Sequence, residues 1–186
     1  TPCQMYTIRA MQALGVTPSE NIELGLGLFC YENFYFEESQ VEKFESDFNI
    51  DISRVEKINI KEDVILRIKD EGKGQRTIHV PFNHLNEYMR PACNACSDFT
   101  NLYADISFGG LGSQSKHTTV IPRTSKGLEV FSEAKNAGIF KCLKLESHEV
   151  EKMKDLITKY SESKIKRYFQ FMKEIKAEGG NNDRSG

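Results

Sequence analysis

The sequence contains no tryptophan, has only five prolines among 186 residues, and carries a net charge of −2. A charge so close to neutral excludes a broadly basic nucleic-acid-binding protein, so no nucleic-acid partner is predicted. No apolar run approaches the roughly 20 residues that cross a bilayer, which predicts no integral membrane segment. The hydrophobic content of 39% is instead typical of a globular chain, which at this length folds without disulfides.

The sequence also lacks an initiator methionine and the charged-then-apolar leader of a secreted protein. It begins Thr1-Pro2-Cys3-Gln4, so we interpret it as a candidate fragment of a longer intracellular protein. Five cysteines without a secretory leader do not predict a disulfide framework. In a reducing compartment, a Cys-x-x-Cys pair with further cysteines is more typical of a metal-binding or redox-active protein.

Charge is distributed unevenly along the chain. Residues 37–51 carry six acids against one lysine, and residues 150–176 carry eight bases against four acids. Solvated helix faces account for both segments, and docking of a partner on the basic segment is the alternative.

Helical and strand patterns intermix, which predicts an α/β or α+β fold with a mixed sheet, flanking helices and a long C-terminal helix. The run 22–29 is too short for a helix and is predicted to be a buried strand, with Cys30 at its carboxyl end. The other strands are expected near 55–60, 63–69, 75–80, 104–108, 118–121 and 139–145, and the other helices near 2–14, 37–49, 82–89 and 125–136.

We predict three parts in this chain. Residues 1–146 are expected to form one domain and residues 147–178 a long basic helix. Residues 179–186, rich in Gly, Asn and Ser, are expected to be a disordered tail.

The cysteines carry the clearest chemical signal. Cys93-x-x-Cys96 places two sulfurs on one tight loop, within reach of a single metal ion or cluster. With Cys3 and Cys30 they make four thiolates, which satisfy either a tetrahedral zinc site or one iron–sulfur cluster. The spacing of the cysteines alone does not favour one of these sites over the other. Cys142 lies in an apolar run without a cysteine neighbour, so we interpret it as a small buried hydrophobic residue.

Two further segments suit anion binding. Residues 109–113, Gly-Gly-Leu-Gly-Ser, directly follow a predicted strand, and such flexible backbone brings N–H groups close to a phosphate, although a plain loop is the alternative. Residues 123–127, Arg-Thr-Ser-Lys-Gly, join a strand to a helix. They suit either a phosphate or carboxylate, or simply a helix start capped by Ser125.

Several stretches occur in a family-specific order over most of residues 1–140. They are Thr1-Pro2-Cys3-Gln4, Gly27-Leu28-Phe29-Cys30-Tyr31-Glu32-Asn33-Phe34, Cys93-x-x-Cys96-x-Asp98-Phe99, Ala104-Asp105-Ile106-Ser107-x-Gly109, and Thr119-Val120-Ile121-x-Arg123-Thr124-x-x-Gly127. In this combination the sequence resembles the beta subunit family of coenzyme F-420 hydrogenases and dehydrogenases.

The resemblance implies a cytoplasmic flavoprotein subunit with FAD and one 4Fe-4S cluster, associated with membranes only through partners. It would oxidise or reduce coenzyme F-420 and exchange electrons with hydrogenase, dehydrogenase or similar redox partner subunits. The family's cysteines match Cys3, Cys30, Cys93 and Cys96, which favours iron–sulfur over zinc. The resemblance and the motifs above predict flavin contacts at Asn33, Asp98, Gly109, Gly110, Gly112, Ser113, Arg123 and Thr124.

Family members carry a further N-terminal segment before the Thr-Pro-Cys-Gln motif, and that segment is expected to contribute to the flavin and deazaflavin sites. The resemblance therefore implies a fragment that keeps its cluster ligands but is inactive alone. Two alternatives remain open. One is a zinc-stabilised, non-catalytic domain that docks partners through residues 150–176, and the other is a related ferredoxin-linked flavin reductase.

Overall fold

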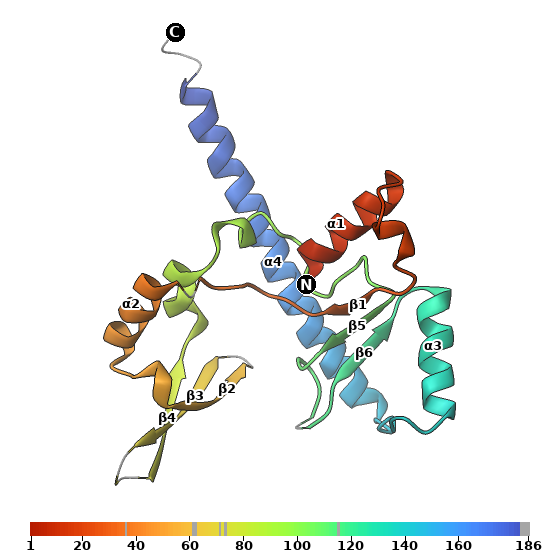
Figure 1. Cartoon of the computed structure of the whole chain (residues 1–186), viewed down its shortest axis with the longest axis horizontal. Helices are drawn as coiled ribbons and strands as arrows, with labels where there is room; N and C mark the ends of the chain where they lie inside the picture. The colour runs from red at the N-terminus through yellow and green to blue at the C-terminus, as the bar shows by residue number, and fades with distance from the viewer. Residues whose placement is uncertain (36, 61–62, 71, 73, 115, 183–186) are drawn as a thin grey trace. The chain divides into compact units, whose positions relative to one another are not determined.

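The computed structural model describes residues 1–35, 37–60, 63–70, 72, 74–114 and 116–182 (Figure 1). The chain forms two compact units, the first from Thr1–Tyr31 with Asn94–Gly186 and the second from Glu32–Cys93. It therefore enters the second unit after Tyr31 and returns to the first after Cys93. Where the sequence predicts one domain over 1–146, the second unit is inserted between the two halves of the first.

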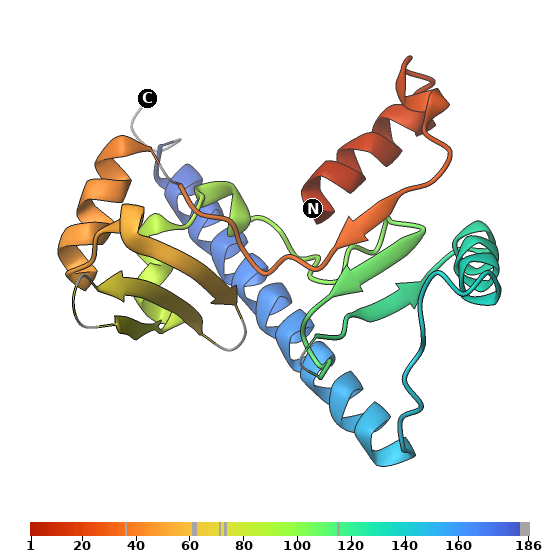
Figure 2. The same ribbon diagram turned by 60° about the horizontal axis from the view of Figure 1, so that its bottom comes forward.

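The first unit is built on a three-stranded sheet in the order β1-β5-β6. Strand β1 (Leu26–Leu28) pairs in parallel with β5 (Ile106–Gly109), and β5 pairs antiparallel with β6 (Thr119–Pro122). Figure 2 shows α1 beside β1 and α3 beside β6. The mixed sheet and the α/β content that the sequence predicts are thereby confirmed.

Three α-helices complete the first unit. Helix α1 (Pro2–Ala13) begins with Pro2 in its first turn, where a missing N–H costs nothing, and is followed by Gly15 at a φ of +65°. The other two helices are α3 (Ser125–Asn136) and the long α4 (Ser147–Asn182). In the described part of the chain, no helix is both long enough and apolar enough to span a membrane.

Asp105, just before β5, joins three segments of the first unit. Its carboxylate accepts hydrogen bonds from the Gly25 N–H at 2.7 Å, the Arg9 guanidinium at 2.7 Å and the Thr124 hydroxyl at 2.8 Å. Burial of the carboxyl raises its pKa, but these three donors together outweigh that effect and lower the pKa of Asp105. The residue thus connects α1, the approach to β1 and the start of α3.

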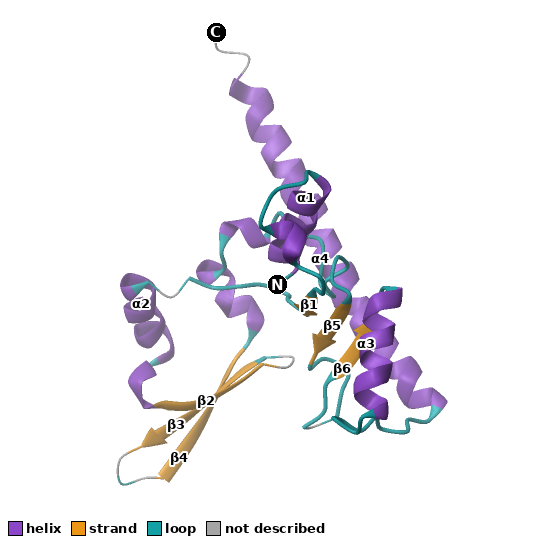
Figure 3. Cartoon of the chain, turned by 45° about the vertical axis from the view of Figure 1, so that its right-hand side comes forward, coloured by secondary structure: helices purple, strands orange, loops and turns teal. Residues whose placement is uncertain are grey.

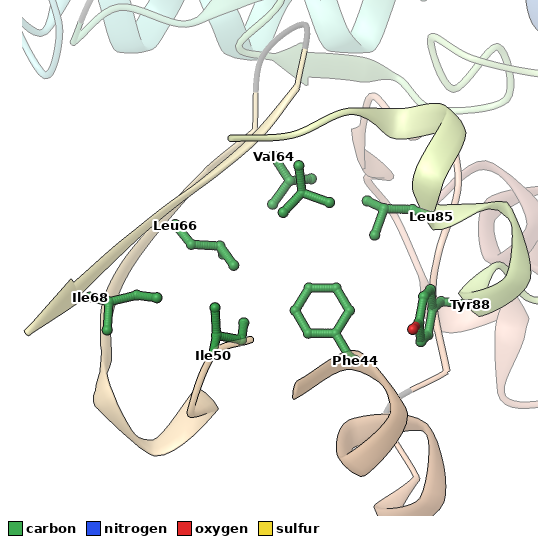
Figure 4. Packing of buried hydrophobic residues seen from close by; sticks show 8 residues of the cluster. Phe44, Ile50, Val64, Leu66, Ile68, Leu85 and Tyr88 are labelled. Atoms are coloured by element: carbon green, nitrogen blue, oxygen red, sulfur yellow. The ribbon is translucent and has the colours of Figure 1, made fainter. Parts of the chain in front are cut away.

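The second unit is an antiparallel meander covered by helices. Its strands are β2 (Val55–Ile60), β3 (Val64–Asp70) and β4 (Gly74–Val80), paired in the order β2-β3-β4. Helix α2 (Glu38–Phe48) and a 3-10 segment (Phe82–Tyr88) pack on it. The core gathers buried side chains from α2, β3, β4 and the 3-10 segment, and from Ile50 after α2 (Figure 4), namely Phe44, Ile50, Val64, Leu66, Ile68, Val80, Leu85 and Tyr88.

The structure confirms most predicted elements and corrects several details. The strand predicted at 139–145 is wrong, since these residues form a loop between α3 and α4 (Figure 3). The buried strand predicted over 22–29 is a three-residue edge strand whose Leu26 and Leu28 side chains are 57% and 60% exposed. The cap of α3 is Thr124, whose hydroxyl accepts from the Gly127 N–H, and not Ser125.

Helix α4 extends further than predicted. It starts at Ser147, as expected, and continues to Asn182, past the predicted end at 178. The first part of the tail predicted as disordered, 179–182, is therefore helical, and residues 183–186 lie outside the described residues.

Candidate functional site

Cys3 lies in the first turn of α1, exposed to solvent. Thr1 caps this helix in a reciprocal pair with Gln4, and its hydroxyl oxygen lies 3.4 Å from the Cys3 Sγ. The N–H groups of the first helical turn have no acceptor within the helix, and they favour negative charge at its N-terminus. The local structure therefore suits a thiolate ligand at this position.

Cys30 and Cys96 belong to two neighbouring loops of the first unit. The Cys30 N–H donates to the carbonyl of Phe99 at 2.9 Å, which holds the loop after β1 against the segment after Cys96. The Cys96 Sγ lies 3.6 Å from the carbonyl oxygen of Asp98. Both cysteines are half-buried. Two of the four predicted ligands thus lie in segments joined directly by a backbone hydrogen bond.

The side chain of Asp98 holds the second of these loops in shape. Its two carboxylate oxygens accept the N–H groups of Asn101 and Leu102, each at 2.8 Å. Because both oxygens bind backbone donors, the structure shows Asp98 organising the turn that follows Cys96. Its predicted contact with a flavin remains a prediction.

Cys93 ends a 3-10 turn (Pro91–Cys93) at the close of the second unit. Its Sγ accepts a hydrogen bond from the backbone N–H of Asn33 at 3.3 Å, and Arg90 donates its N–H to the carbonyl of Asn33 at 2.9 Å. The entry and the exit of the second unit therefore lie side by side within that unit. N–H donation to a cysteine sulfur is one of the interactions that tune iron–sulfur clusters.

Cys142 lies apart from these loops, exposed in the segment between α3 and α4, and not buried as the sequence predicts. No disulfide joins any of the five cysteines, all of which fall in the described part of the chain. Across the described ranges, no three His, Cys, Asp or Glu side chains are close enough to hold a metal ion together. The predicted four-cysteine ligand set therefore stays a prediction.

Arg123 and Thr124, predicted as phosphate or ring partners, are both hydrogen-bonded inside the first unit. The Arg123 guanidinium donates to the Ser107 hydroxyl at 2.8 Å and to the Thr100 hydroxyl at 2.7 Å. Burial lowers the pKa of Arg123, against a smaller opposite effect of Asp98. Thr124 caps α3 and donates to Asp105. These bonds make both residues supports of the loops around them.

The glycines of loop 109–113 differ in how closely other atoms approach them. A Cβ at Gly109 would lie 1.9 Å from the ring of Phe29, so this glycine allows the close approach of that ring. Gly112 has a φ of +79°, which favours glycine. A Cβ at Gly110 would meet nothing within 4 Å. The Ser113 hydroxyl lies 2.8 Å from the carbonyl oxygen of Gly110 and closes the loop on itself.

A cavity of about 810 Å³ lies in the first unit next to this loop. Its lining is mainly apolar and comes from the sheet, α3, the 139–145 loop and the start of α4. Gly112, Ser113, Lys116 and His117 belong to the lining as well. The apolar residues of 139–145 explain why the sequence predicts a strand there, since they face this cavity instead of pairing in a sheet.

Lys164 is a site residue that sequence reasoning missed. It lies on α4, is only 1% exposed, and donates to the carbonyl oxygens of Cys30 at 2.6 Å and Asp98 at 2.8 Å. A signal was present in the sequence. The apolar stripe of Met153, Ile157 and Tyr160 continues at helical spacing to position 164, where a lysine stands at an expected core position.

Residues 1–148 match the family model that describes the C terminus of the coenzyme F420 hydrogenase/dehydrogenase beta subunit. The chain belongs to this family. The coenzyme F420 hydrogenase subunit beta of Methanosarcina barkeri is 30% identical over 182 residues, which cover 96% of this chain and 60% of that protein. The resemblance drawn from the sequence motifs is therefore confirmed.

Two further matches are to proteins named for coenzyme F420. A coenzyme F420-dependent sulfite reductase of Methanocaldococcus jannaschii is 31% identical over 197 residues, covering 98% of this chain and 28% of that protein. A chain of the F420-reducing NiFe hydrogenase complex from Methanosarcina barkeri matches with a TM-score of 0.80 at 29% identity, covering 94% of this chain and 59% of that one. This chain thus spans about 60% of the length of the hydrogenase subunits it matches.

Proposed function

We propose that this chain is the cluster-binding part of a beta subunit that transfers electrons between reduced coenzyme F-420, FAD and one 4Fe-4S cluster, and on to partner subunits. Its membership of the family supports the proposal, as do relatives named for coenzyme F420 hydrogenase and sulfite reductase. The structural observation that carries it is the joining of the Cys30 loop to the segment after Cys96, through Phe99 and Lys164.

The chemistry of the donor set fits such a cluster. Cys3, Cys30, Cys93 and Cys96 offer four thiols, and one 4Fe-4S cluster takes four cysteine ligands. The loops around Cys93 and Cys96 also have backbone groups at hydrogen-bond distance from the sulfurs. Cys142 lies in a separate exposed loop and is left out of the proposed ligand set.

When bound, FAD would take a hydride from the reduced deazaflavin and deliver its electrons singly to the cluster. The chain's own residues then have to hold ligands and shape loops. For contacts with the flavin we propose Asn33 and the loop 109–113. Asp98, Arg123 and Thr124 remain proposed flavin contacts, and their hydrogen bonds within the chain also support the neighbouring loops.

Anaerobic purification followed by metal analysis tests the cluster. We expect a brown protein with about four irons and matching acid-labile sulfide per chain. Cys93→Ser should abolish the cluster, whereas Cys142→Ser should leave iron and sulfide unchanged and serves as the matched control. A colourless protein with stoichiometric zinc would overturn the proposal, and loss of iron in Cys142→Ser would overturn the ligand set.

A second experiment addresses the substrate. The full-length protein should oxidise reduced coenzyme F-420 with a dye as electron acceptor, followed by the absorbance of the deazaflavin. Turnover with reduced ferredoxin but none with reduced coenzyme F-420 would instead favour the ferredoxin-linked flavin reductase.

A further inference from the structure

Helix α4 contributes several residues that hold the Cys30 loop, although the matched family residues end at 148, just after the helix begins. Tyr160 stacks on Phe99, with ring centroids 6.0 Å apart, and meets the ring of Tyr31 edge-on at 5.6 Å. The Ser163 and Tyr31 hydroxyls lie 2.8 Å apart. The helix thus packs against both segments that adjoin Cys30 and Cys96.

Two cations on the same helix bind carbonyl oxygens of these segments. The Lys164 ammonium donates to the carbonyls of Cys30 and Asp98. One turn further on, the Arg167 guanidinium donates to the Tyr31 carbonyl at 2.8 Å and lies 4.8 Å from the centre of the Tyr31 ring. The Asp98 carbonyl is also the group 3.6 Å from the Cys96 Sγ, so Lys164 binds backbone belonging to both cysteine loops.

The charge of Lys164 has no partner of opposite sign on the described part of the chain. Its Nζ forms no ion pair with any carboxylate there, and its side chain is 1% exposed. A buried ammonium without an anion is costly, and two carbonyl dipoles offset only part of that cost. An anionic group held by the two loops would offset the rest. A 4Fe-4S cluster with four thiolates carries net negative charge, more so when it is reduced.

We propose that Lys164 is a positioning residue that fixes the Cys30 and Cys96 loops on α4 and whose charge raises the reduction potential of a cluster bound there. This inference rests on the proposed function. A positive charge close to the cluster stabilises the reduced, more negative state over the oxidised state. Because the ammonium is buried, water and salt weaken this effect much less than they would for a surface lysine.

Three variants of the full-length protein separate the two roles of Lys164, which are to hold the cysteine loops and to raise the reduction potential. Lys164→Gln removes the charge but keeps a donor, Lys164→Met removes both, and Lys166→Met is the matched control because Lys166 is an exposed lysine on the same helix. Each is purified anaerobically and analysed for iron and acid-labile sulfide. The midpoint potential of the cluster is then measured by a redox titration followed by electron paramagnetic resonance.

We expect the potential of Lys164→Gln to move to more negative values with iron content near that of the unmodified protein. Lys164→Met should show the same shift with reduced iron content, and Lys166→Met should match the unmodified protein in both. An unchanged potential in Lys164→Gln would overturn this inference while leaving the proposed function intact. An unmodified protein without iron would overturn both. The potential is decisive, because a purely structural role of the lysine would change only cluster content.

Discussion

Replacing Asp105 by asparagine should destabilise the first unit strongly and make its stability less dependent on pH. The aspartate accepts hydrogen bonds from Gly25, Arg9 and Thr124, all shorter than 2.9 Å. Asparagine keeps the size but not the charge, and its NH2 group must replace one of the two oxygens that accept these hydrogen bonds. The substitution therefore weakens these charge-assisted hydrogen bonds and removes the negative charge that faces Arg9.

The size of the effect follows from these contacts. Removing one member of a buried ion pair costs about 3–5 kcal/mol, and the Arg9 side chain is 27% exposed, which places this pair near the lower end. A loss of about 3 kcal/mol corresponds to a fall in melting temperature of roughly 6–12 °C for a chain of this size. Differential scanning calorimetry at pH 7 measures it.

The pH dependence has a definite sign. The pKa of Asp105 is lower in the folded state than in the unfolded chain, where an aspartate has a pKa of about 3.9. Its contribution to stability is thus fully present above the unfolded pKa and is lost as the pH falls through the lower folded pKa. The difference between the unmodified protein and Asp105→Asn should therefore stay constant from pH 7 to about pH 4 and shrink as the pH falls further.

Asp155→Asn, on the exposed face of α4, is the matched control and should melt like the unmodified protein. Two results would refute the role assigned to Asp105. One is a melting temperature of Asp105→Asn within about 2 °C of the unmodified protein at pH 7. The other is a difference that stays constant down to pH 3.

Two further pairs of substitutions test the packing of buried positions against that of exposed ones. Phe44→Ala should lower the free energy of unfolding by about 3–5 kcal/mol in urea titrations, because Phe44 lies in the core of the second unit. Phe169→Ala, at a position 58% exposed, should change the free energy of unfolding by less than about 0.5 kcal/mol. Equal effects of the two substitutions would contradict the assigned core. Gly109→Ala should destabilise the first unit by about 1–3 kcal/mol, because the added Cβ would collide with the ring of Phe29. Gly110→Ala should leave the melting temperature unchanged, because a Cβ there meets nothing within 4 Å. Similar melting temperatures for the two variants would contradict this packing.

Local signals in the sequence predict the helices and the meander well. Pro2 and Gly15 mark the two ends of α1, and a three-residue connection that includes Gly72, followed by Gly74 at the start of β4, marks the β3–β4 hairpin. Residues 71 and 73 of that connection lie outside the described residues. These signals depend on backbone conformation and on nearby residues alone, so a single sequence is enough to find them.

Features that depend on distant contacts were missed. An apolar run such as 139–145 has the composition of a strand, and only the fold decides whether it pairs or lines a cavity. Sequence motifs identify the cysteine loops, but the contact of Lys164 with the Cys30 carbonyl spans 134 residues. No local pattern reveals such a contact. A lysine on an apolar helical stripe indicates only that its ammonium is buried and needs polar partners from another segment.

The insertion of the second unit into the first has a consequence for the order of folding. Gly25 and Asp105, which meet beside the β1–β5 pair, are 80 residues apart in sequence, so closing this contact in an unfolded chain is entropically costly. The second unit is continuous in sequence, and its own ends meet at the Phe34–Met89 bridge. If it folds first, the flexible loop left between β1 and β5 is roughly threefold to fourfold shorter, which lowers the closure cost by about 1 kcal/mol. In that case the inserted meander acts as a folded spacer, which shortens the flexible chain between the two halves of the surrounding sheet.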